Sequence, residues 1–300
     1  MQGMVPRDRA PATLHMVQAG QFPNSGDCVH VSWQATVMKN LFVEDLRVIA
    51  AGLPSDPQEW PHIPCPTCKR SGLLVDSLTE EESPLSKSQQ AGGFDWDPSY
   101  IHGKFHAVLK CPKSKCETVR LVGTTGHWET GKYGWDQYYE PLFFLPELPL
   151  IQDFGTCPLS VRDRIEAASA VLWVDPSSAA NRLRAAVEEL MNHHRVPRMG
   201  INKKNDEFRL SLASRIEQFS ANRPELSDVV DPLTAIRWLG NAGSHDAVLK
   251  VSDALDAVEI LTHIIHRLYD TSGEILIKKV EDVNARRGMP ISRSLDSPPF

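Results

Sequence analysis

The sequence has no hydrophobic stretch of about 18 residues, the length that a membrane-spanning helix needs. Its first twenty residues lack the charged-then-apolar order of a secretion signal. Basic residues are not in excess: the sequence contains 32 Lys and Arg and 38 Asp and Glu, which gives a net charge of −6. A strong nonspecific binder of duplex DNA normally carries a basic excess. We therefore expect a cytoplasmic protein without a membrane anchor, in which any nucleic-acid contact is local.

Composition indicates a soluble globular chain. Its 300 residues are 41% hydrophobic and 23% charged, which is ordinary for about two domains. The chain has six cysteines, and four of them form two close pairs. Paired cysteines in a chain of this size favour reduced thiols that bind metal over disulfides.

The two cysteine pairs have the spacing of zinc knuckles. Cys65 and Cys68 enclose Pro-Thr, and Cys111 and Cys116 enclose Pro-Lys-Ser-Lys. Such turns present two thiolates each to one tetrahedral ion, so we expect structural Zn²⁺ on these four cysteines. The alternative is four buried free thiols.

Forty-two residues separate Cys68 from Cys111, where about 15 to 20 are usual in a zinc ribbon. Residues 77–93 explain the excess, since their Glu, Ser, Gln and Gly content is typical of a flexible, solvated insert. Three nearby histidines could replace a cysteine, but we expect surface or core roles for His102, His106 and His127. Cys28 and His30 are expected to pack rather than bind metal.

Strand patterns surround the second knuckle. Residues 105–109 lead into Cys111 and residues 118–122 lead out, which predicts a hairpin. An aromatic strand and an extended linker, residues 141–150, should follow. These aromatics either pack in a sheet, the reading we favour, or stack on bases. The zinc-ribbon-containing region is expected at residues 28–150, after a loosely ordered segment 1–27.

The pattern changes to helical periodicity after Cys157. Ser160 and Asp175-Pro176 are predicted helix starts, and apolar residues then recur three and four apart with no strand signal. The sequence predicts an all-α bundle of about five helices over 158–282, with the last helix running from near Ser252 towards Val280. Residues 284–300 resemble a disordered tail. The fold class is therefore α+β.

One stretch of the helical half gathers residues suited to chemistry. A predicted helix contains Ile236 and Arg237, approaches Gly240 and Asn241, and is followed by His245. In an unbroken helix Arg237 and His245 would differ by about 12 Å of rise and roughly 80° of rotation, too far to share one substrate atom. Asn241 and His245 would be neighbours on one face.

These five residues fill the signature of the family called domain of unknown function 4145, which the stretch closely resembles. That family is similar to the HEPN superfamily of helical bundles, many of which are metal-independent ribonucleases with an Arg, four to six residues, then His. Seven residues intervene here. The resemblance implies His245 as general acid or base, Arg237 as phosphate ligand and Asn241 as positioning group, with Arg237 supplied by a second subunit of a homodimer where needed.

Structural roles explain the same residues equally well. Gly240 would end or kink the helix, Asn241 would cap it, Arg237 would pair with an acidic neighbour and His245 would bond a carbonyl. Two hypotheses therefore stand. The first is a metal-independent ribonuclease or RNA-processing effector of a bacterial defence or toxin system. The second is a non-catalytic module that binds nucleic acid or protein and dimerises through its bundle.

Overall fold

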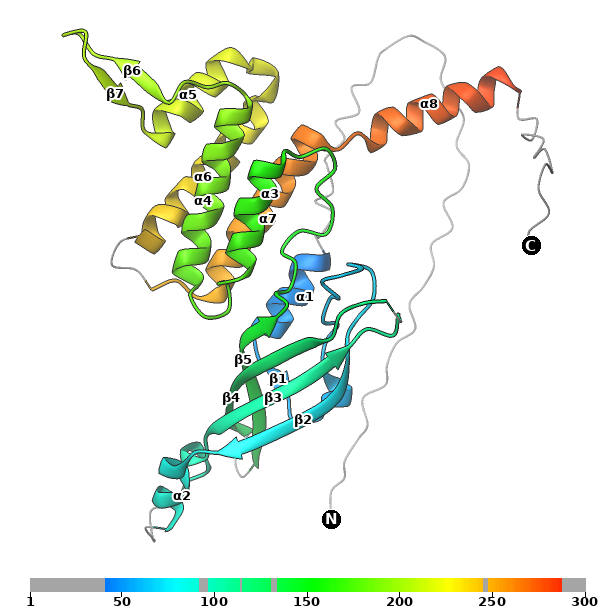
Figure 1. Ribbon diagram of the computed structural model, residues 1–300, viewed down its shortest axis with the longest axis vertical. Helices are drawn as coiled ribbons and strands as arrows, with labels where there is room; N and C mark the ends of the chain where they lie inside the picture. Colours follow the sequence, from blue (N-terminus) through cyan, green and yellow to red (C-terminus); the bar gives the residue numbers. More distant parts are fainter. Residues whose placement is uncertain (1–40, 92–96, 114, 131–133, 245–247, 288–300) are drawn as a thin grey trace, which may run out of the picture. The chain divides into compact units, whose positions relative to one another are not determined.

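The computed structural model describes residues 41–91, 97–113, 115–130, 134–244 and 248–287. An antiparallel sheet occupies its first half and helices occupy its second (Figure 1), which confirms the α+β class. The expectations for residues 1–27, Cys28, His30 and His245 lie outside the described residues. So does the tail beyond residue 287, while residues 284 and 285 still belong to a helix.

The sheet has five strands in the order β1-β5-β4-β3-β2, each antiparallel to its neighbours. Their bounds are β1 Leu53–Pro54, β2 Leu74–Glu82, β3 Gly103–Lys110, β4 Val119–Thr130 and β5 Gly134–Leu145. Alternate residues of β3, namely Phe105, Ala107 and Leu109, are buried, as expected for a strand with one face on a core. The predicted hairpin around the second knuckle is confirmed as β3 paired with β4.

Helix α1, Leu41–Ala50, contributes Leu46 and Ile49 to the same buried core. Its Arg47 donates to Asp256 at 2.7 Å and to Glu259 at 2.9 Å, both in the helical half. Short 3₁₀ turns occupy Pro57–Glu59 and Pro98–Tyr100.

The solvated insert predicted for residues 77–93 is not a loop in its described part. Residues up to Glu82 belong to β2, and Pro84–Ala91 form helix α2. Pairing with β3 engages one side of the backbone of this polar edge strand, and side chains add partners: Glu80 accepts from Gln137 at 2.7 Å and also from Tyr139. Composition cannot predict such cross-strand partners, which is why it favoured a loop.

The linker predicted from residue 141 begins later, because β5 continues to Leu145. Pro141 lacks an amide hydrogen, yet it is tolerated in β5 since β1 pairs only with Tyr138 and Tyr139. Tyr139 is buried against Phe105 and Trp60, so for this residue sheet packing is the correct reading.

The helices of the second half are α3 Leu159–Ser169, α4 Pro176–His193, α5 Leu212–Asn222, α6 Val230–Ser244, α7 Val251–Tyr269 and α8 Ser272–Ala285, with a 3₁₀ turn at Pro224–Val229. Asp175 caps α4 as predicted, accepting from the Ser178 amide at 2.9 Å. The start predicted at Ser160 is wrong by two residues, since Pro158 is the N-cap of α3. None of the described helices has the length and apolarity needed to cross a membrane.

Two features correct the expectation of an uninterrupted bundle. A hairpin of β6, Met199–Ile201, and β7, Glu207–Arg209, precedes α5, so Phe208 is in a strand and not in a helix. Its turn is made by the Asn202 side chain, which accepts from the Lys204 and Asp206 amides at 2.8 and 2.9 Å.

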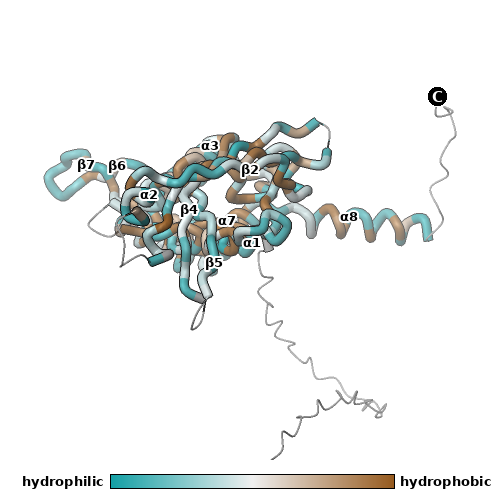
Figure 2. The backbone as a smooth tube through the Cα atoms, turned by 90° about the horizontal axis from the view of Figure 1, so that it is seen from below, coloured by the Kyte–Doolittle hydropathy of each residue, from teal (hydrophilic) through white to brown (hydrophobic). Residues whose placement is uncertain are grey.

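The helix expected to run towards Val280 is divided at Asp270 and Thr271. Asp270 accepts from the Ser272 amide at 2.7 Å, a local bond that favours a turn over a continuous helix. Helix α8 has no buried residue, and its exposed apolar side chains are Ile275, Leu276, Ile277 and Val280. Hydrophobic and hydrophilic residues alternate along this helix (Figure 2).

Candidate metal centre and α6 motif

The four predicted cysteines meet at one point. Within the described residues, the Sγ atoms of Cys65, Cys68, Cys111 and Cys116 all lie within 4.8 Å of one another. The Cys68 and Cys111 sulfurs are 3.9 Å apart, close to the roughly 3.8 Å expected between two ligands of a tetrahedral zinc ion with bonds of about 2.3 Å. The cluster is therefore compatible with a zinc site, and four thiolates are a soft donor set that zinc accepts.

Backbone geometry builds the first knuckle. The Lys69 amide donates to the Cys65 carbonyl and the Cys65 amide to the Ser71 carbonyl, both at 2.9 Å, while Lys69 takes a left-handed φ of 53°. The Lys69 carbonyl then accepts from Gln152 at 2.7 Å. At the second knuckle the Lys113 amide lies 3.5 Å from the Cys111 sulfur.

The surroundings shift the pKa values of three of these thiols, Cys65, Cys68 and Cys116, in different directions. Backbone amides of Arg70 and Ser71 lower the pKa of Cys68 to about 6, so its thiolate is favoured near neutral pH. Burial raises the pKa of Cys65, and desolvation raises that of Cys116 to about 12. Four sulfurs this close cannot all be anionic without a cation, whereas a dication would stabilise all four thiolates.

Helix α6 does not end or kink at Gly240, contrary to the structural role predicted for that residue. The helix continues through Gly240 and Gly243 to Ser244. A β-carbon on Gly240 would lie 2.4 Å from the Arg184 β-carbon, and one on Gly243 would lie 2.6 Å from the Ser177 carbonyl oxygen. Both glycines therefore permit close packing of α6 on α4.

Arg237 does not pair with an acidic neighbour either. Its guanidinium lies 4.1 Å from the ring centre of Trp238, and no carboxylate among the described residues forms an ion pair with it. The Arg237 Nε is buried and has no hydrogen-bond partner in the described part of the chain, and Trp238 is 60% exposed. Asn241 is half-buried one helical turn later.

The structure thus brings Arg237, Trp238 and Asn241 onto adjoining parts of one helix. His245 lies outside the described residues, directly after Ser244. Because α6 is unbroken, Arg237 and Ser244 differ by about 10 Å of helix rise. The bend at the glycines that would bring Arg237 back towards residue 245 is absent from this helix.

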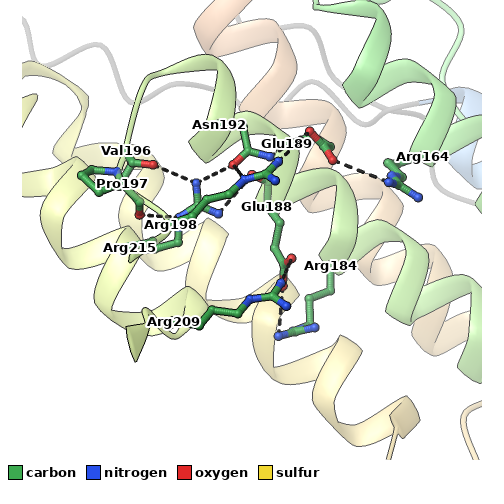
Figure 3. Close-up of polar contacts among 10 residues, drawn as sticks. All are labelled: Arg164, Arg184, Glu188, Glu189, Asn192, Val196, Pro197, Arg198, Arg209 and Arg215. Carbon is green, nitrogen blue, oxygen red and sulfur yellow. Dashed lines mark hydrogen bonds and ion pairs between the residues drawn. The ribbon is translucent and has the colours of Figure 1, made fainter. Parts of the chain in front are cut away.

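The sequence analysis did not identify a second group of charged residues. Arginines of α3, α4, the β6–β7 hairpin and α5 line one polar cavity together with two glutamates of α4 (Figure 3). We call it the arginine pocket; its charged and amide residues are Arg164, Arg184, Glu188, Glu189, Asn192, Arg198, Arg209 and Arg215. These arginines are spread over 52 positions of sequence from 164 to 215 without a motif, so no local signal marks them.

Two family models match the chain. Residues 166–286 match a domain of unknown function, DUF4145, and residues 55–146 match another, DUF8608. The first match confirms the family resemblance drawn from the α6 motif, and the second contains all four clustered cysteines. No curated protein and no solved structure matches.

Proposed function

We propose that this chain, whose residues 166–286 form a DUF4145 domain, is a non-catalytic module that binds single-stranded RNA through α6 and holds its sheet region together with structural zinc. The observation that carries the RNA proposal is the Arg237 guanidinium stacked 4.1 Å over the exposed Trp238 ring with no acidic partner among the described residues.

An exposed indole offers a face on which an unpaired base stacks, and stacking contributes about 1 to 3 kcal/mol per base. The guanidinium beside it is free to contact a backbone phosphate, and the Asn241 amide one turn later is a donor and acceptor for a base edge. A chain of net charge −6 is unsuited to broad phosphate binding, so a small site that relies on stacking fits its composition.

The zinc proposal rests on the geometry of the four sulfurs. Zinc would be held by Cys65, Cys68, Cys111 and Cys116 as a closed site, with no open position for substrate. Its contribution would be to stability, because the ion links the turn before β2 to the turn between β3 and β4.

Fluorescence anisotropy with a labelled unstructured RNA tests the α6 site. Trp238→Ala should weaken binding by about tenfold, as expected for loss of one stacked base. Trp128→Ala is the matched control, since Trp128 is 55% exposed but belongs to β4. Equal affinities of wild type and Trp238→Ala would refute the proposal.

The salt dependence gives a second readout. If Arg237 supplies the main phosphate contact, the slope of log K against log salt should be close to the roughly −0.7 per phosphate of single strands. A slope several times steeper would indicate a basic surface elsewhere.

A metal-independent ribonuclease is the second candidate. The unpaired Arg237 favours it, because a guanidinium without an acidic partner is suited to stabilise a phosphoryl transition state. His245 would then act as general acid or base, and the arginine would be supplied by a second copy of the chain. If the chain is a ribonuclease, His245→Ala should lower the cleavage rate by about two to four orders of magnitude. If it only binds RNA, wild type cleaves no RNA and His245→Ala should bind it with unchanged affinity.

A further inference from the structure

The arginine pocket has the size of a small-molecule site and an unusual lining. Its volume is about 640 Å³, and its apolar residues are only Leu210 and Leu212. Pockets of roughly 300 to 1,000 Å³ commonly hold small ligands, but most are lined by apolar and aromatic groups. A polar pocket of this size indicates a charged ligand with little apolar bulk.

The charges of the lining are unbalanced. Five arginines face two glutamates, which leaves an excess of three positive charges. Glu188 lies between Arg184 and Arg209, and Glu189 between Arg164 and Arg198 (Figure 3). Arg215 pairs with no carboxylate of the described residues; its hydrogen bonds there go to three backbone carbonyls and to the Asn192 amide oxygen.

Hydrogen bonds of Asn192 and Arg215 hold this lining in place. The Asn192 oxygen accepts from Arg215 at 2.7 Å and from Arg198 Nε at 2.8 Å, and its amide nitrogen donates to Glu189 at 2.9 Å. Arg215, only 4% exposed, also binds the Val196 and Pro197 carbonyls at 3.0 and 3.1 Å. The turn after α4 is thereby fixed to α5, which orients Arg198 before any ligand arrives.

Several guanidinium donors remain available. The nearest nitrogen-to-carboxylate distances are 3.5 Å for Arg209, 3.6 Å for Arg164 and 4.0 Å for Arg198, all longer than the roughly 2.7 to 3.2 Å of a good hydrogen bond. The Arg184 Nε also has no hydrogen-bond partner among the described residues, although it is buried. In an ion-pair network that only stabilises the fold, each guanidinium N–H would donate to a carboxylate at hydrogen-bond distance, and these three pairs do not reach that distance.

We propose that the arginine pocket binds a chain of two or more linked phosphates. Guanidinium groups match phosphate oxygens in bidentate geometry, and several arginines around one cavity provide them. A single phosphate carries at most two negative charges at neutral pH and would leave the excess of three unbalanced, whereas a diphosphate or triphosphate balances it. The lack of an aromatic lining residue implies that the phosphate chain itself is recognised, not a base or ring.

Isothermal titration calorimetry of the full chain with sodium tripolyphosphate tests the site. The key variant is Arg164→Gln with Arg209→Gln, because these side chains are 53% and 81% exposed and make no buried contact that folding needs. It should bind at least about tenfold more weakly, since it loses two charge-assisted donors. The matched control is Arg182→Gln, an exposed arginine of α4 that does not line the pocket, and it should bind like wild type.

Three further titrations complete the design. Orthophosphate should bind far more weakly than tripolyphosphate. Trp238→Ala should bind tripolyphosphate like wild type, because the proposed RNA site on α6 is a different site. ATP distinguishes the sources of the phosphate chain: tighter binding of ATP indicates a nucleotide, and equal or weaker binding indicates an inorganic chain. The inference is overturned if wild type binds no tripolyphosphate, if the double variant binds unchanged, or if Arg182→Gln or Trp238→Ala weakens binding as much.

Discussion

Gly240 shows how one residue supports both the fold and the position of the α6 motif. The β-carbon of an alanine there would lie 2.4 Å from the Arg184 β-carbon and 3.1 Å from the Ala180 carbonyl oxygen, so the two helices would have to separate. We expect Gly240→Ala to lower the free energy of unfolding by about 1 to 3 kcal/mol, the usual cost of overpacking, as measured by urea unfolding.

Gly273 in α8 provides the matched control, because nothing lies within 4 Å of an added β-carbon. Gly273→Ala should be neutral or stabilise by up to about 1 kcal/mol through helix propensity. Equal stability of Gly240→Ala and wild type would contradict the close packing of α6 on α4.

The sequence identified Gly240, Asn241 and Arg237 as one motif, but two structural roles expected there are wrong: the helix end at Gly240 and the acidic partner of Arg237. A glycine in a helical pattern usually indicates the end of the helix. Gly240 instead lacks a side chain because Arg184 of the neighbouring helix α4 packs against it, which local sequence does not show. Arg237 was expected to find a carboxylate, whereas it stacks on the residue next to it. Roles that depend on a distant neighbour are not encoded in local spacing.

At the scale of elements, Asp175 gives a prediction with a pH dependence. Its hydrogen bonds to Ser178 hold the pKa of its carboxyl below the ordinary value, since they stabilise the anion. A carboxylate with a depressed folded pKa stabilises the fold above the unfolded pKa near 4, and that stabilisation is lost as pH falls through the folded pKa. Asp175→Ala should therefore cost about 0.5 to 2 kcal/mol at pH 7, as expected for a lost N-cap.

The difference in melting temperature between Asp175→Ala and wild type should become smaller below about pH 4. Asp175→Asn keeps a capping oxygen without titrating, so it should remain close to wild type at pH 7. A constant penalty for Asp175→Ala across the acid range would show that the cap does not depend on the charge.

Element prediction succeeded where the signal was local and failed where it was not. The Asp175-Pro176 start and the strands around Cys111 follow from capping and alternation within a few residues. Strand β2 and the β6–β7 hairpin depend on pairing, and their polar residues resemble a loop when taken alone. The arginine pocket is a further case, because four separate elements supply its side chains.

At the scale of the molecule, the four-cysteine cluster should determine whether the sheet region is stable. We expect one zinc ion per chain by native mass spectrometry, and its loss in Cys68→Ser or Cys111→Ser with a lower melting temperature. Cys157→Ala is the control, since Cys157 is buried apart from the cluster, and it should retain the ion. A folded, metal-free wild type with four reactive thiols would refute the zinc proposal.

A single gel experiment tests whether α6 binds RNA without cutting it. A 5′-labelled unstructured RNA is incubated with wild type in buffer without added Mg²⁺, and native and denaturing lanes are compared. If α6 binds RNA without cleavage, the native lane contains a shifted band that Trp238→Ala weakens, and the denaturing lane contains intact RNA. Cleavage products that disappear with His245→Ala would contradict it and identify the chain as a ribonuclease.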